Sequence, residues 1–408
     1  MVLMLSGCVK EEKTVKRAVF AWNGVETEDR VILDKYQIDT IFMDINHYSS
    51  ISNYNIFVLA GDPPGEQMIC RKWWMKRRRK EQTEYYLILR MTTHCLLQTS
   101  HFSIHTYLGI IAMVMGHIGF GGKFDHFIHA FHMPMFFFIS GFFYRRRDCS
   151  FGEYVGKKGK SLLILYISFG VTHYLASLIL DGFSIKPLLH LLTINTNGLP
   201  IAGALWFLTA LFFTDVLYFF LDRWNVKWLI VPLVLVGSFA DQLLPYPLPL
   251  ALSASFVGLG LYWLGEMSKR YEDKLRVALN MNWWQILIVG VITTGLIFVN
   301  GYINMREGRY AFLPLFWINA LLSVYLGISI SKLICRIGEM KWLTSIGQNS
   351  IVYVCLNQIV IRIMFKVFSY VQMPKLLSHL LILALSMFVL YWLAELFTRT
   401  KLKVFIGK

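Results

Sequence analysis

Long apolar segments recur from about residue 103 to residue 398, and they constrain the fold more than any other feature. A helix needs about 20 mainly apolar residues to cross a bilayer, where every backbone polar group must be satisfied within the segment. The candidate spans are residues 103–120, 124–144, 161–180, 203–221, 228–243, 250–265, 284–301, 311–330, 346–367 and 377–397. The sequence therefore predicts an all-α, polytopic membrane helix bundle with about ten transmembrane helices.

The composition excludes an ordinary soluble protein. Hydrophobic residues make up 56% of the chain, charged residues only 16%, and the mean hydropathy is +0.50. The net charge of +15 then indicates membrane topology and contact with lipids, because no soluble basic fold that would bind nucleic acid is apparent. The six cysteines lack CxxC spacing, so the sequence predicts neither a disulfide framework nor a zinc site.

Basic residues are concentrated in alternate loops between the predicted spans. Lysine and arginine favour the cytoplasmic side of a membrane. The basic set of loops includes residues 71–80, Arg145–Arg147, Lys157, Lys158 and Lys160, and ends in a basic tail at residues 399–408. The opposite loops hold only Lys123, Lys186, Arg306, Arg309 and Lys375. We expect a multi-pass protein of the cell membrane with both termini in the cytoplasm.

Residues 1–90 differ in character from the membrane part. The stretches VFAWNG, DTIFMDI and NIFVLAGDPPG suggest strands combined with a helix, a short soluble α/β-like segment. It is similar to the opening of a barrel-type glycosidase domain, but it is too short to bury a core of its own. Leu5–Cys8 is similar to a lipoprotein cleavage site, although the apolar segment before it is too short. We expect a truncated or fused segment without a catalytic role.

Polar groups gather in residues 113–141, MVMGHIGFGGKFDHFIHAFHMPMFFFISG. His117 ends an apolar run, and after a glycine-rich turn come Asp125, His126, His129 and His132. Ionisable side chains are costly in hydrocarbon, so this cluster indicates a functional site. Helical spacing predicts that Asp125, His129 and His132 share one face. Such spacing also suits a metal, but no further ligand set is apparent, and we predict no metal site.

Three blocks of the membrane part are similar to acyltransferase family 3 of integral membrane proteins, particularly to its fucose 4-O-acetylase-like branch. They are GIIAMVMGH at 109–117 with FHMPMFFFISGFF at 131–143, ALWFLTALF at 204–212, and IGQNSIVYV at 346–354. The resemblance covers about residues 103–398. It implies transfer of an acyl group, usually acetyl from acetyl-CoA as co-substrate with no tightly bound cofactor, to a hydroxyl of a surface glycan or a lipid-linked sugar.

The resemblance also assigns roles near His117, which matches the family's catalytic histidine. Histidine suits acyl transfer to a hydroxyl because its pKa is near neutral, and it can act either as the base or as a carrier of the acyl group. Asp125 and His132 are expected to orient it, and His129 to line the path of the acceptor. The family usually has a basic residue about ten positions upstream, where Thr106 and Tyr107 stand here. Lys123, Arg90 or a residue of another helix is then expected to substitute, or activity is impaired. A histidine that usually follows the third block is replaced by Asn357.

The basic groups after the second span have two interpretations. Arg145, Arg146, Arg147, Lys157 and Lys158 anchor the topology, or they also bind the phosphates of acyl-CoA, which guanidinium groups suit.

Further polar and aromatic residues lie in the other blocks. Trp206, Asn349 and Ser350 are candidates for substrate binding, with packing as the alternative for Trp206. Ser140 has no GxSxG elbow around it, so Ser140 and Gly141 are expected to permit close helix packing. Glu266 and Glu395 are expected to be solvated at the cytoplasmic ends of their spans.

Three functions remain open at this stage. The first is a membrane O-acetyltransferase acting on a cell-surface polysaccharide or its precursor. The second is a translocation or assembly protein that uses the bundle as a path for a polysaccharide. The third is an inactive acyltransferase-like remnant, since the chain departs from the family pattern at Thr106, Tyr107 and Asn357.

Overall fold

The computed structural model describes residues 105–197, 199, 203–271, 274, 281–337 and 341–400, together with short strands in the N-terminal part. The chain divides into two compact units, Met1–Gln98 and Thr99–Lys408. The strands of the first unit are β1 (Ala18–Trp22), β2 (Val25–Asp29), β3 (Tyr54–Asn55), β4 (Val58–Gly61) and β5 (Met68–Arg71).

The strands of the first unit pair in antiparallel fashion. One sheet has the order β2-β1-β3, and β4 pairs with β5. Strands were expected at VFAW and VLAG and are found there, but a βαβ unit would pair its strands in parallel. The sequence between β1 and β2 is Asn-Gly, a pair that favours a tight antiparallel hairpin. The predicted helix and the stretch DTIFMDI lie outside the described residues.

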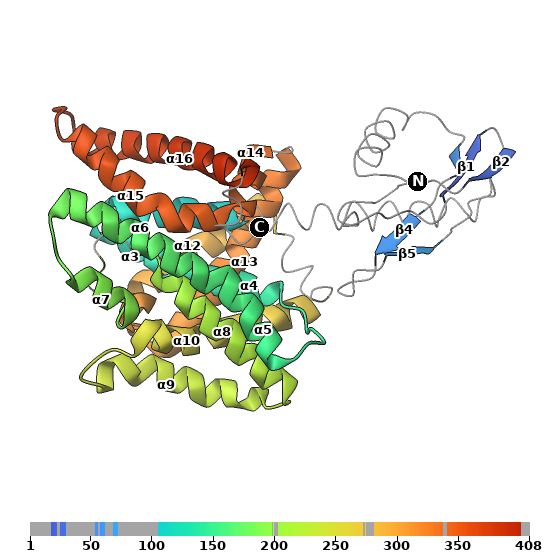
Figure 1. The fold of residues 1–408 in the computed structure, drawn as a ribbon, viewed down its shortest axis with the longest axis horizontal. Helices are drawn as coiled ribbons and strands as arrows, with labels where there is room; N and C mark the ends of the chain where they lie inside the picture. The colour runs from blue at the N-terminus through green and yellow to red at the C-terminus, as the bar shows by residue number, and fades with distance from the viewer. Residues whose placement is uncertain are drawn as a thin grey trace. The chain divides into compact units, whose positions relative to one another are not determined.

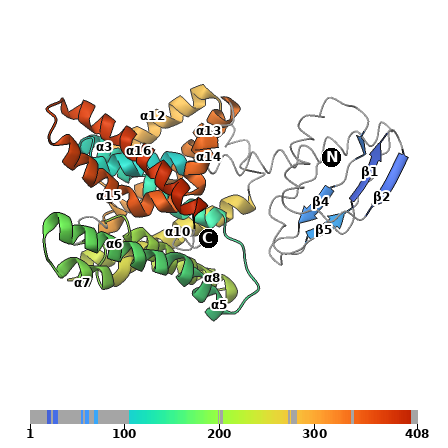
Figure 2. The ribbon, with the colours of Figure 1, turned by 45° about the horizontal axis from the view of Figure 1, so that its top comes forward.

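The second unit is a bundle of helices (Figure 1). The described part of this unit starts with the helix His105–Ile118. It continues with α3 (Gly122–His129), α4 (His132–Phe142), α5 (Phe151–Lys158), α6 (Ile164–Asp181), α7 (Lys186–Leu192), α8 (Trp206–Arg223), α9 (Ile230–Leu243), α10 (Leu252–Arg270), α12 (Trp283–Asn300), α13 (Leu313–Ile337), α14 (Lys341–Gln348), α15 (Ser350–Phe368) and α16 (Lys375–Arg399). In Figure 1, α16 lies beside α15 and α9 lies beside α10, and Figure 2 shows α12 beside α13.

Six of the described helices are long and apolar enough to cross a membrane. They are Phe151–Ile179, Pro249–Arg270, Trp283–Asn300, Leu313–Ile334, Ser350–Phe368 and Lys375–Arg399. Large apolar side chains are exposed on α9, α12 and α16, among them Val231, Val299 and Phe388. Exposed apolar surface of this kind suits contact with lipid chains, not water. The membrane helix bundle is confirmed, whereas the count of ten spans stays a prediction.

The expected span 124–144 is divided into two helices. α3 ends at His129 and α4 begins at His132, with Phe131 in a non-helical conformation between them. Pro134 is the third residue of α4, where its missing amide hydrogen breaks no helical hydrogen bond. The single helix expected over residues 124–144 is therefore wrong, because it is interrupted before His132.

α4 runs through the core of the bundle. Ten of its 11 residues are buried, as expected for a helix that is apolar on all sides. Glycines bring it close to α10: a Cβ atom on Gly141 would lie 1.9 Å from the Tyr262 carbonyl oxygen, and one on Gly265 would lie 2.1 Å from that of Phe138. The Ser140 hydroxyl donates to the Phe136 carbonyl within the same helix. The close helix packing predicted at Gly141 is confirmed, whereas Ser140 lines a pocket.

The close contact between α4 and α10 predicts a large effect of Gly141→Ala. The added methyl group forces the two backbones apart, and we expect a loss of about 1–3 kcal/mol in stability. Thermal unfolding of the detergent-solubilised protein, followed by size-exclusion chromatography, measures this loss. Gly156→Ala in α5 is the matched control, because nothing lies within 4 Å of its added Cβ. Equal melting temperatures for the two variants would contradict the packing described here.

Candidate active site

His117 lies in the last turn of the helix His105–Ile118. The helix ends there because Gly119 adopts a positive φ of 80°, a conformation that commonly terminates helices. The half-buried imidazole places Nδ1 3.1 Å from Nε2 of Gln358, on α15. His117 is thus fixed by a polar residue from the middle of another membrane helix.

The Gln358 side chain bears on the protonation of His117. In the orientation described, the carboxamide donates to Nδ1, while its own buried Oε1 has no partner in the described part of the chain. A half-turn of the carboxamide places Oε1 at Nδ1 instead, where it accepts from an Nδ1–H. In that arrangement Nε2 of His117 is the unprotonated nitrogen. Gln358 can therefore select which nitrogen of His117 acts as a base.

Two further histidines lie around His117. Nδ1 of His129 donates to the Asp125 carbonyl and Nδ1 of His132 to the Ile128 carbonyl, each at 2.8 Å. Because a carbonyl oxygen only accepts, these bonds leave Nε2 unprotonated in both neutral rings. The His129 and His132 ring centroids are 5.3 Å apart, and both residues interact electrostatically with His117. The grouping of the three histidines is the result of the turn between α3 and α4.

Arg306 supplies a positive charge beside His117. It lies in the 3₁₀ turn η4 (Met305–Glu307) between α12 and α13, and its Nε donates to the Thr196 carbonyl at 2.7 Å. A Cβ atom on Gly203 would lie 2.9 Å from Nη1 of Arg306 and 3.1 Å from Nε2 of Gln358. The Arg306 guanidinium and the Gln358 carboxamide thus both lie against Gly203, where a larger side chain would not fit. The charge of Arg306 acts on His117.

The residues expected to support His117 behave differently from the prediction. No hydrogen bond joins the Asp125 carboxylate to His117 among the described residues, and the buried Oδ1 of Asp125 has no partner there. Thr106 lies at the opposite end of the helix, Lys123 is exposed, and Arg90 lies outside the described residues. Arg306 and Gln358 were missed as site residues. A polar loop, NMREGRY, and a glutamine inside an apolar span were the signals that could have identified them.

We call the region around His117, His129, His132 and Arg306 the histidine end of the bundle. Contacts between distant segments hold it together: His126 bonds to the Gly301 carbonyl at 2.7 Å, and the Leu250 amide donates to the Thr193 carbonyl at 2.8 Å. The opposite region, around Arg145–Arg147, Lys158 and Lys227, is called the basic end.

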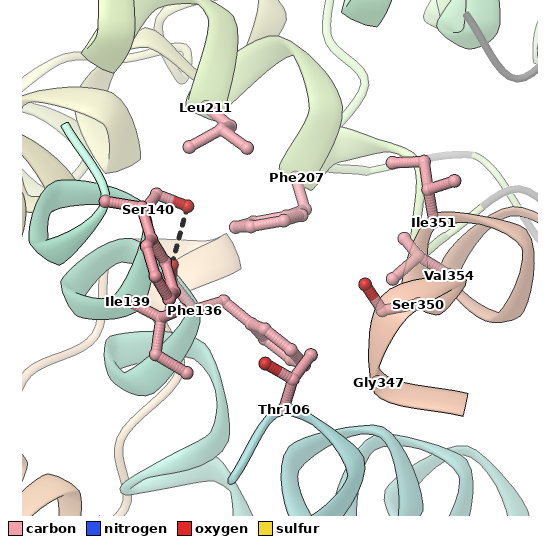
Figure 3. A pocket seen from close by; sticks show the side chains of 11 residues that line it. Thr106, Phe136, Ile139, Ser140, Phe207, Leu211, Gly347, Ser350, Ile351 and Val354 are labelled. Carbon is pink, nitrogen blue, oxygen red and sulfur yellow. Dashed lines mark hydrogen bonds between the residues drawn. The ribbon is translucent and has the colours of Figure 1, made fainter. Parts of the chain in front are cut away.

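A pocket of about 280 Å³ opens near the basic end (Figure 3). Its lining is mostly apolar and comes from α4, α8 and the junction of α14 with α15. Figure 3 shows the hydroxyl groups of Thr106 and Ser350 directed toward the cavity, while Ser140 bonds to its own helix. Thr106 and His117 lie on one helix, about 16 Å apart at 1.5 Å per residue. One helix thus connects the pocket to the histidine end.

Arg145, Arg146 and Arg147 are exposed in the loop that follows α4, next to the pocket residue Phe143. Of these three, Arg146 forms an ion pair with the buried Asp222, with Nε 3.8 Å from Oδ2. Lys157 is exposed as well, on the last turn of α5.

Lys158 differs from these basic neighbours. Its ammonium group pairs with the buried Asp215 at 2.7 Å, and Asp215 also accepts from the Tyr262 hydroxyl at 2.6 Å. The charge of Lys158 is therefore balanced within the protein and joins α5 to α8. This ion pair favours a structural role for Lys158 over the predicted binding of phosphate.

Glu266 and Glu395 are not solvated, contrary to expectation. The Glu266 side chain is only 15% exposed, accepts from the Tyr218 hydroxyl at 2.7 Å, and pairs with Lys227 and Arg270. Glu395 is 16% exposed and pairs with Arg399 at 2.6 Å. Lys227 also pairs with Asp222 at 2.7 Å, so a connected set of charges holds the basic end together.

The remaining predicted substrate residues belong to the core or to the pocket. Trp206 begins α8 and is buried in the core, so its ring faces are covered by other side chains. Asn349 is buried directly before α15, and Ser350 lines the pocket. Ser350 precedes Gln358 by about 12 Å along α15.

The Lys158–Asp215 pair predicts a difference between two neighbouring lysines. Lys158→Met leaves the buried Asp215 without its counter-charge, and we expect a loss of about 1–3 kcal/mol, between the values for surface and fully buried pairs. Lys157→Met, one residue away and exposed, should leave the melting temperature unchanged. Thermal unfolding in detergent measures both. A melting temperature of Lys158→Met equal to that of the wild type would exclude a structural role for the pair.

Comparison with known proteins identifies the family. A search of curated proteins found no match to the chain. A family model described as an acyltransferase domain matches residues 107–396, more than half of the 408 residues. The matched region contains His117, the pocket and α15 with Gln358, and it includes the apolar helices that are able to cross a membrane. The chain therefore belongs to acyltransferase family 3 and is a membrane acyltransferase.

Proposed function

We propose that the protein transfers an acetyl group from acetyl-CoA to a hydroxyl of a cell-surface polysaccharide or of its lipid-linked precursor. The observation that carries this proposal is the pairing of His117 with Gln358 at one end of a helix whose other end borders an apolar pocket. The similarity of the sequence blocks to the fucose 4-O-acetylase-like branch supports an acetyl donor and a sugar acceptor.

In this proposal His117 is the general base. Gln358 accepts from Nδ1–H, so that Nε2 takes the proton of the acceptor hydroxyl as the oxygen attacks the thioester carbonyl. The carbon–sulfur bond then breaks, and the departing thiolate takes the proton from the imidazolium. The products are an O-acetyl ester and free CoA, and His117 returns to its starting state. His129 and His132 line the acceptor side of the same site.

The donor is proposed to approach from the basic end. The apolar pocket suits the acyl-pantetheine arm, and the hydroxyls of Thr106 and Ser350 suit its amide groups. Arg145 and Arg147 are exposed shortly after the pocket residue Phe143, Lys157 is exposed on α5, and all three suit the phosphates of CoA. Lys158 is left out because Asp215 balances its charge.

The alternative functions have less support. A path for a polysaccharide requires an open route through the bundle, whereas α4 and its close contact with α10 fill the centre. An inactive remnant was suggested by the missing basic residue near Thr106, but Arg306 brings a positive charge to His117 from another loop. Both observations favour an active enzyme.

Replacing His117 tests the enzyme hypothesis directly. We expect His117→Ala to lower acetylation of surface glycan at least about 100-fold, because general base catalysis contributes about 10²–10⁴-fold. Mass spectrometry of glycan from cells expressing each variant measures acetylation, and glycan export is measured in parallel. His190→Gln, another histidine outside the cluster, is the control. Lost export with unchanged acetylation would support the polysaccharide path instead.

The orientation of the protein in the membrane provides a second test of the proposed function. We propose that the basic end and both termini face the cytoplasm of the cell, because lysine and arginine are concentrated there. In a cysteine-free background, a cysteine at Lys123 should react with an impermeant maleimide in intact cells. A cysteine at Lys157 should react only after permeabilisation, since both positions are exposed but lie at opposite ends. The reverse labelling pattern would invert the proposed roles of the two ends.

A further inference from the structure

Arg306 is held rigidly by the loop that carries it. The backbone of Asn304 pairs with that of Arg309, and the Asn304 side chain accepts from the Arg306 amide at 3.1 Å. Gly308 closes the turn with a positive φ of 65°. On the side chain, the bond from Nε to the Thr196 carbonyl fixes one edge of the guanidinium. The other edge lies toward Gly203 and Gln358, which in turn contacts His117.

The charge of Arg306 is not balanced by the described part of the chain. No carboxylate lies within ion-pair distance of it there, and the adjacent Glu307 pairs with Arg309 at 3.2 Å. Burial lowers the pKa of the Arg306 guanidinium, and Glu307 raises it. A partly buried cation without a counter-charge is costly. Arg306 also lies at the end of the bundle that has few basic residues. The topology of the membrane protein therefore does not explain why an arginine is present there.

The neighbours of Arg306 are also mainly basic. His117, His129 and His132 gather on the same side, and Asp125 interacts with this group through His129. The Asp241 carboxylate lies against Gly308 of the same loop, where it accepts from the Ser253 hydroxyl and the Leu248 amide. At the basic end, by contrast, Asp215, Asp222 and Glu266 each have cationic partners. The histidine end therefore has an excess of positive or protonatable groups where the acceptor is proposed to bind.

We propose that Arg306 binds a negatively charged group of the acceptor, beside the hydroxyl that His117 activates. The group is a carboxylate of an acidic sugar or a phosphate of a lipid-linked sugar, since the planar guanidinium fork matches both. The proposal rests on the proposed function, because it assumes that the acceptor enters at the histidine end. It adds that the acceptor is anionic near the position that is acylated.

Binding measurements with paired probes test this site on the full-length protein in nanodiscs. The first pair is a glucuronate-containing oligosaccharide and its carboxyl-reduced neutral form. The second pair is a polyprenyl-diphosphate sugar and the same sugar without the phosphates. We expect the wild type to bind the charged member of one pair at least about tenfold more tightly, since one charge-assisted bidentate contact contributes roughly 1.5–3 kcal/mol. The pair that shows the preference identifies the source of the anion.

Variants of two arginines in the same loop show whether the preference depends on Arg306. Arg306→Gln should bind the charged and neutral probes equally, and Arg306→Lys should keep part of the preference. Arg309→Gln is the matched control and should keep all of it, because Arg309 is an exposed partner of Glu307. Unchanged melting temperatures exclude a folding defect, and Arg306→Lys covers the case in which Arg306→Gln is unstable. No preference in the wild type, or a full preference in Arg306→Gln, overturns the proposal.

The same experiment separates this inference from the proposed function. His117→Ala should lose acetyl transfer but keep the preference for charged probes, because Arg306 is intact. A wild type that prefers charged probes without transferring acetyl groups would leave the anion site standing and exclude the enzyme hypothesis. If Arg306 acted only on the transition state, Arg306→Gln would slow transfer to charged and neutral acceptors equally, and the anion site would be wrong.

Discussion

The close packing of α4 against α10 is the contact on which the arrangement of both ends depends. In a bilayer, helices gain little from the hydrophobic effect between them, so small residues that permit close approach become decisive. Gly141 and Gly265 provide this approach, and each faces a backbone carbonyl of the other helix. α4 begins at His132 and is followed by Arg145–Arg147, so its position fixes a histidine at one end and the arginine loop at the other.

The two ends of the bundle differ in whether their charged groups have partners. At the basic end the carboxylates are paired with cations and accept from tyrosine hydroxyls, as in the Tyr262–Asp215–Lys158 set. Paired charges of this kind hold helices in register and leave little capacity for a ligand. At the histidine end Arg306 is anchored only by a carbonyl, and the buried Oδ1 of Asp125 and Oε1 of Gln358 lack partners within the described residues. Unsatisfied polar groups near a histidine are the pattern expected of a substrate-binding site.

Sequence reasoning found the membrane bundle, His117 as the central residue and the packing role of Gly141. It placed His129 and His132 near His117, but for the wrong reason, because it assumed one continuous helix. It also predicted that Lys158 binds phosphate and that Glu266 is solvated, although each forms an ion pair with a residue far away in the sequence. The stabilising partners of a charge come from other helices, and no local pattern reveals them. Arg306 and Gln358 were missed for the same reason, since they lie 189 and 241 positions from His117.

The sequence by itself determined that the chain is a helical membrane protein, and its similarity to acyltransferase family 3 indicated the reaction class. Both follow from local properties: the length and apolarity of segments, and short blocks of residues around His117. Only the tertiary structure decided which groups surround that histidine, because helices that are distant in sequence become neighbours by packing. Gln358 contacts His117 and Arg306 acts on it electrostatically, while Gly203 lies against both of these side chains, so three different segments of the chain build its surroundings. The physical reason is that side-chain packing and the pairing of buried charges, not periodicity, select the neighbours within the bundle.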